Sequence, residues 1–78
     1  MTETELNNLI LTILKGIAPD VDPDEIEPDE NFRDQFDFDS LDFLKFMTEL
    51  GQALGREIPA RDYPKLASLS GCLTLLAK

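Results

Sequence analysis

The tripeptide Asp39-Ser40-Leu41 combines side chains that could do chemistry at the start of a helix. Aspartate is a favoured N-cap residue, which would place Ser40 in the first turn. Unpaired backbone N–H groups and the helix dipole favour a bound anion at that position. We therefore expect Ser40 to be exposed and suited to carry a phosphate ester.

The rest of the chain offers nothing that would make Ser40 a catalytic nucleophile. Histidine is absent, which removes the usual general base, the commonest metal ligand and any Ser-His or Cys-His pair. The glycines form no phosphate-cradling loop. The sequence predicts that the protein is not an enzyme and that another enzyme modifies Ser40.

A calcium loop is the first rival interpretation of an acidic helical chain. Asp20, Asp22 and Asp24 match the first three ligand positions of an EF-hand. Glu25 then occupies the place of the required glycine, and Asn31 that of the bidentate glutamate. We therefore expect no metal site.

Length and composition indicate one domain, residues 1–78, with 42% apolar residues. No apolar stretch approaches the roughly 20 residues of a membrane span, and Met1-Thr2-Glu3 does not resemble a signal peptide. We expect a cytoplasmic monomer. Cys72 lies in the apolar run 69–76, so a buried small hydrophobic side chain is expected there.

The net charge of −9 is concentrated before Ser40. This charge argues against nucleic acid as a partner and favours a basic protein surface, because opposite charge speeds and orients encounter. The alternative is that the acidity only keeps the protein soluble. Within residues 19–39 a single base, Arg33, faces ten acids: Asp20, Asp22, Asp24, Glu25, Glu27, Asp29, Glu30, Asp34, Asp37 and Asp39.

The first helix is expected to begin at Glu3, because Thr2 and Glu5 have capping-box spacing, and to stop at Ala18-Pro19. Residues 18–39 would form a long loop with one short helical turn at residues 23–26. Its spaced apolar residues are expected to pin it across the helices: Val21, Ile26, Phe32 and Phe36.

A second long helix is expected from Ser40 to about Leu54, with Gly55 as the residue that ends it. Beyond it, residues 57–59 read as extended. Residues 61–65 suggest a short helix, which Pro64 opposes. Ser68 or Ser70 would cap a last helix running to Lys78.

Two sides of the second helix carry apolar residues. Phe43, Phe46, Met47, Leu50 and Leu54 form a broad apolar face. Leu41 and Leu44 fall on another side with Lys45 and Thr48, where they either pack under the loop or dock a partner.

The segment around Ser40, Asn-Phe-Arg-Asp-Gln-Phe-Asp-Phe-Asp-Ser-Leu-Asp over residues 31–42, resembles the prosthetic-group motif of acyl carrier proteins. The resemblance extends over nearly the whole chain. It implies an all-α, four-helix bundle with a long first loop and a short third helix. It further implies that Ser40 carries 4′-phosphopantetheine, donated from coenzyme A by a phosphopantetheinyl transferase, and that acyl groups ride on the arm as thioesters.

The same resemblance assigns roles to residues of the second helix. Asp39 would cap the helix and present Ser40, and acyl-loading, acyl-transfer or condensing enzymes with basic surfaces would dock there. The expected docking residues are Asp37, Leu41, Asp42, Leu44, Lys45 and Thr48. A fatty chain could enter the bundle among four further residues, which could equally be ordinary core: Phe43, Phe46, Met47 and Leu50.

Three departures from the family pattern affect partner choice or local structure. Asp37 replaces the usual glycine, Lys45 and Gly51-Gln52 stand where acids are common, and Pro64 interrupts the third helix. Two alternatives stay open: a peptidyl or aminoacyl carrier with the same fold, and an unmodified acidic helical module that only binds proteins.

Overall fold

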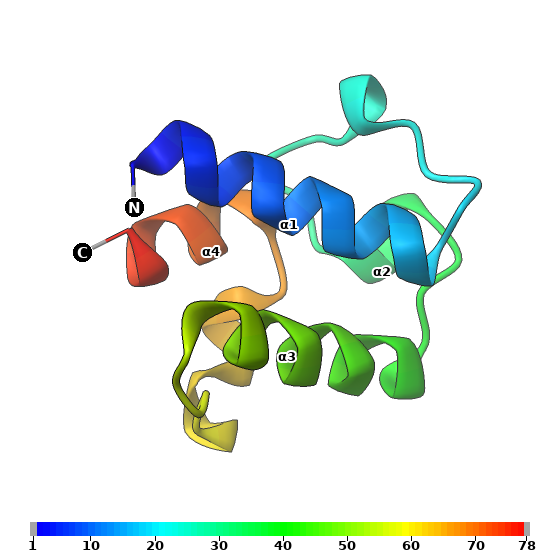
Figure 1. Cartoon of the computed structure of the whole chain (residues 1–78). Coiled ribbons are helices and arrows are strands. Elements are labelled where there is room, and N and C mark those ends of the chain that lie inside the picture. Colours follow the sequence, from blue (N-terminus) through cyan, green and yellow to red (C-terminus); the bar gives the residue numbers. More distant parts are fainter. Residues whose placement is uncertain (1, 78) are drawn as a thin grey trace.

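The computed structural model describes residues 2–77, which fold into helices joined by loops (Figure 1). The expected all-α class is confirmed, with four helices of seven or more residues and two shorter turns. In chain order these are α1 (Glu3–Ile17), η1 (Pro23–Glu25), α2 (Phe32–Gln35), α3 (Ser40–Leu54), η2 (Ala60–Leu66) and α4 (Leu69–Leu76). None of the helices in the described part of the chain has the length and apolar content to cross a membrane.

Helix α1 begins as its capping box predicts. The Thr2 hydroxyl accepts from the Glu5 amide at 3.1 Å, and the Glu5 carboxylate accepts from the Thr2 amide at 3.0 Å. The helix runs antiparallel to α3 and packs against both α3 and α4 (Figure 1). Its buried stripe consists of Leu6, Ile10 and Leu14.

The long loop contains more structure than the sequence indicated. The short turn is present as η1, and Val21 and Phe32 are buried while Ile26 and Phe36 pack partly buried against the core. The expectation of an otherwise irregular loop is wrong, because α2 forms within it. The Asn31 side chain caps α2 by accepting from the Arg33 amide, a local hydrogen bond that the hydrophobic pattern does not reveal.

Gln35, at the end of α2, fastens the acidic part of this loop. Its side-chain oxygen accepts from the Glu27 amide at 2.7 Å, and its side-chain nitrogen donates to the carbonyls of Glu27 and Glu30. These three bonds satisfy backbone groups that would otherwise depend on water. The acidic segment is therefore held in one shape although its carboxylates stay exposed.

Helix α3 ends where predicted, at a left-handed Gly55 with φ 70°. Gly51, on the preceding turn, allows the chain to fold back closely. A Cβ atom there would lie 2.8 Å from the Arg56 carbonyl oxygen, so close packing requires glycine at this position. The glycine lowers the helix propensity of α3 in return.

The expected extended segment at residues 57–59 is present and leads into η2, a 3₁₀ helix that contains Pro64. Ser68, rather than Ser70, caps α4 by accepting from the Gly71 amide at 3.1 Å. Helix α4 ends at Leu76; the expected continuation to Lys78 includes a residue outside the described range. Gly71 packs so closely on η2 that a Cβ atom would overlap the Lys65 carbonyl oxygen.

Aromatic rings fill the space between α3 and the segment before it. Phe32 and Phe46 are fully buried and meet at 5.7 Å with an interplanar angle of 89°. Phe38 contacts both rings, and Phe36 and Phe43 extend the cluster to either side. Edge-to-face pairs of this kind add stability beyond their burial. The cluster fixes the segment that delivers the chain to Ser40.

Candidate functional site at the start of α3

Ser40 is the first residue of α3 and is exposed. Phe38, only 3% exposed, holds the chain two residues earlier, so the backbone enters the helix from a fixed point. Asp39 adopts an extended conformation and its carboxylate accepts from the Asp42 amide at 2.9 Å. The predicted N-cap is confirmed, and the hydroxyl of Ser40 is presented at the helix end.

The backbone amides at this end are divided between caps and solvent. The Asp39 carboxylate accepts a hydrogen bond from the Asp42 amide, and the Asp39 carbonyl accepts one from the Phe43 amide at 2.9 Å. The amides of Ser40 and Leu41 stand before the first intrahelical bond and stay available to an anion. A phosphodiester on Ser40 would therefore lie beside unpaired donors and the positive end of the helix dipole.

The residues expected to dock partners differ in how far they are exposed. Leu41 is 75% exposed and Leu44 50% exposed, so the loop does not cover them. Asp37 and Lys45 are also exposed. Asp42 is half-buried and its carboxylate bonds weakly back to the Asp39 amide at 3.4 Å, which gives it a capping role as well.

The four residues expected to line an acyl pocket do not share one environment. Phe46 and Leu50 are fully buried among other core residues. Phe43 is partly buried against the core. Met47, only 2% exposed, also lines an open groove.

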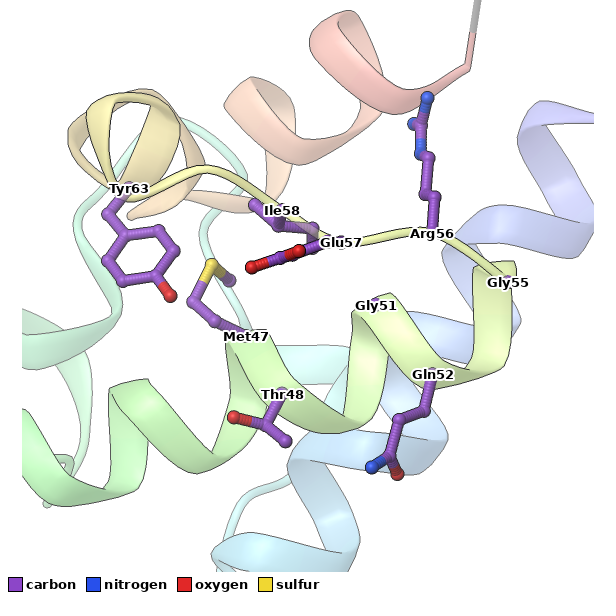
Figure 2. A pocket seen from close by; sticks show the side chains of 9 residues that line it. All are labelled: Met47, Thr48, Gly51, Gln52, Gly55, Arg56, Glu57, Ile58 and Tyr63. Carbon is purple, nitrogen blue, oxygen red and sulfur yellow. The ribbon is translucent and has the colours of Figure 1, made fainter.

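This groove lies between α3 and the segment that follows it (Figure 2) and has a volume of about 420 Å³. The side chains of Met47, Ile58 and Tyr63 converge in it, whereas those of Gln52 and Arg56 extend away from them (Figure 2). Thr48 also lines it, and its hydroxyl donates to the Leu44 carbonyl at 3.0 Å.

Sequence reasoning did not include Ile58 and Tyr63 among the site residues. The extended segment at residues 57–59 was the available signal, because it lays Ile58 across Gly51. The signal for Tyr63 was absent, since a proline in the middle of η2 argued against a helix that would direct the ring toward α3.

Cys72, the only cysteine, is buried as expected. Its thiol donates to the Leu66 carbonyl at 3.3 Å, and burial raises the pKa of Cys72 to about 12. A thiol that stays protonated is unreactive at neutral pH, so it takes no part in the chemistry of the site.

Comparison with known proteins decides the family. Residues 8–73 match the family model described as the phosphopantetheine attachment site. Acyl carrier proteins of Lactobacillus johnsonii, Rubrobacter xylanophilus and Thermosynechococcus vestitus are 36%, 37% and 31% identical to this chain. The alignments cover 88%, 77% and 86% of it, and 85%, 78% and 86% of the relatives. The chain belongs to the acyl carrier protein family.

Membership of the acyl carrier protein family makes 4′-phosphopantetheine the prosthetic group. The residues present fit such a group, because an exposed hydroxyl with two available amides lies at the start of α3, and an open groove borders the same helix from Met47 onward. As an acyl carrier protein the chain interacts with a phosphopantetheinyl transferase and with acyl-handling enzymes, and it is a carrier rather than a catalyst.

Proposed function

We propose that the protein carries acyl groups as thioesters on 4′-phosphopantetheine joined to the Ser40 oxygen. The observation that carries this proposal is the position of Ser40: exposed, at the capped start of α3, within a segment that matches the attachment-site family. The arm supplies a thiol that forms and releases thioesters. The protein itself supplies the tether and the surface that enzymes bind.

Attachment transfers the 4′-phosphopantetheinyl group of coenzyme A to Ser40. A bond forms between Ser40 Oγ and phosphorus, the pyrophosphate bond of coenzyme A breaks, and the nucleotide half leaves. We expect the hydroxyl proton to pass to a base of the transferase, because this chain has no histidine and one oxygen of the Asp39 carboxylate already accepts from the Asp42 amide. Asp39 therefore positions Ser40 by fixing the helix end.

Partner enzymes would dock on the outer side of α3. Leu41 and Leu44 offer apolar contacts, Lys45 and Thr48 lie beside them, and Asp37 and Asp42 with the loop acids give electrostatic guidance. Apolar contacts surrounded by charge suit brief binding to several partners with basic surfaces. The pathway would be fatty acid, polyketide or related lipid biosynthesis, in the cytoplasm.

The proposal is tested by incubating the protein with coenzyme A, Mg²⁺ and a broad-specificity transferase. Intact mass spectrometry should show one added phosphopantetheine on the wild type and none on Ser40→Ala. Ser70→Ala is the matched control, because it removes another serine hydroxyl without removing the Ser68 cap, and it should be modified normally. An unmodified wild type would overturn the proposal.

The charge distribution gives a second test. Association with the transferase should weaken as ionic strength rises, because exposed charges are screened beyond about 8 Å at physiological salt. Titration of binding against salt concentration measures this effect. An affinity that does not change with salt would contradict electrostatic guidance by the acidic loop.

A further inference from the structure

A continuous stripe on α3 connects Ser40 with the groove. Ser40, Leu44, Met47 and Gly51 are spaced by four, three and four residues, so they follow the border between the exposed side of the helix, which carries Ser40 and Leu44, and the buried side, which carries Met47 and Gly51. At 1.5 Å per residue, Met47 lies about 10 Å along the axis from Ser40. An arm attached to Ser40 and laid along this border passes Leu44 and enters the groove at Met47.

The groove has an apolar floor and a polar rim. Met47 and Ile58 are 2% and 8% exposed, and Gly51 between them is also buried. Thr48 and Glu57 line the groove and are exposed. An apolar chain segment fits over such a floor, and a polar group fits the rim.

Tyr63 lines this groove and also contacts the phenylalanine cluster. Its ring contacts that of Phe43 edge-on, with 5.7 Å between centroids and an angle of 85°. Phe43 in turn contacts Phe46 and Phe38 at 6.4 Å each. Tyr63 is thus the last ring of the aromatic cluster and at the same time a wall of the groove.

We propose that Tyr63 is a specificity-determining residue: its ring, held against Phe43, closes the groove toward the core and limits the length of the acyl chain that the groove can hold. This inference rests on the proposed function. Short acyl groups lie over Met47 and Ile58, and the distal part of a longer chain stays in solvent. The preferred cargo is therefore a short acyl chain.

The experiment uses protein loaded on Ser40 with butyryl, hexanoyl, octanoyl or decanoyl pantetheine. Hydroxylamine then cleaves the thioester, and its rate reports how well the cargo is covered. In the wild type, protection should rise with chain length and level off within this series. In Tyr63→Ala it should go on rising, by about fourfold for each further methylene that becomes buried.

Tyr63→Phe is the matched control, since it keeps the ring and its contact with Phe43. Its rates should agree with the wild type within about twofold. If Tyr63→Ala loses cooperative unfolding, Phe43→Leu replaces it: this change removes the same ring contact, leaves an apolar side chain and should likewise extend protection to longer chains.

Three results would overturn the inference. These are protection in the wild type that rises through decanoyl, no protection at any length, and a Tyr63→Ala series that levels off with the wild type. Failure of the proposed function gives a different result, because the protein would then gain no acyl-pantetheine mass at Ser40. In that case both the carrier function and the role of Tyr63 would be wrong.

Discussion

The two ends of α3 are terminated in different ways: side-chain caps form one end, and glycines form the other. At the N-terminal end the side chains of Asp39 and Asp42 form the cap, and residues 39–41 are exposed to solvent. At the C-terminal end two glycines allow the backbone to turn and return closely over the helix. The difference indicates that the first end is adapted to presentation and the second to packing. Substitutions at the two ends should therefore separate function from stability.

Among substitutions at the two ends of α3, Gly51→Ala should have the largest effect on the free energy of unfolding. The added Cβ would lie 2.8 Å from the Arg56 carbonyl oxygen, and the resulting overpacking should cost about 1–3 kcal/mol. This exceeds the gain of about 1 kcal/mol in helix propensity. Gly16→Ala is the control, because no atom lies within 4 Å of the new Cβ, and it should stabilise by about 0.5–1 kcal/mol. Urea unfolding of both variants measures the contrast, and equal shifts would contradict it.

At the other end, Asp39→Ala should lower the free energy of unfolding by about 1 kcal/mol, because the amide of Asp42 loses its cap. Asp39→Asn keeps a side-chain acceptor, so its free energy of unfolding should fall by only a few tenths of the loss in Asp39→Ala. Asp37→Ala removes an exposed carboxylate outside the capping box and should stay within about 0.5 kcal/mol of wild type. Denaturant titration of the three variants is the measurement. A loss at Asp37 as large as at Asp39 would mean that charge, rather than capping, dominates.

Leu41→Ala should impair modification of Ser40 while leaving the stability of the fold nearly unchanged. Because Leu41 is 75% exposed, its truncation should change stability by less than about 0.5 kcal/mol. If Leu41 contacts the transferase, kcat/KM for modification should fall about tenfold, the effect of losing a moderate interface contact. Asn8→Ala, on the exposed side of α1, controls for general surface effects. Unchanged kcat/KM would remove Leu41 from the docking surface.

The smallest effect concerns the capping box of α1, which offers a third helix end for comparison. The hydrogen bond from the Thr2 amide holds the pKa of Glu5 below its ordinary value of 4.5. A lowered pKa means that Glu5 stabilises the fold above about pH 4.5 and that this contribution is lost as pH falls below it. The stability difference between wild type and Glu5→Ala should therefore shrink between pH 7 and pH 3. A stability difference that does not change with pH would contradict a contribution from the ionised Glu5 carboxylate.

The sequence predicted the parts of the fold that depend on local rules. The ends of α1 and α3 followed from capping residues and glycine, and the buried face of α3 followed from helical spacing. Helix α2 was missed because four residues give no periodic signal and its cap, Asn31, lies in a loop of many polar residues. The position of Ser40 was predictable for the same reason that α3 was.

The groove could not be predicted because it depends on contacts between distant segments. Its floor needs Ile58 to lie across Gly51, and its wall needs the ring of Tyr63 to reach Phe43. The spacing within α3 placed Phe46 and Leu50 on the same face as Met47, but it did not tell which of them borders open space. Only the path of the chain after Gly55 decides that.

Every role proposed for this protein requires that the hydroxyl of Ser40 bears the arm. Top-down fragmentation of the protein after reaction with coenzyme A and the transferase tests it most directly, because the fragments locate the added mass along the chain. We expect a single phosphopantetheine on fragments that contain Ser40, and none elsewhere. A modification on Ser68, Ser70 or any other side chain, or none at all under conditions that modify another acyl carrier protein, would contradict it.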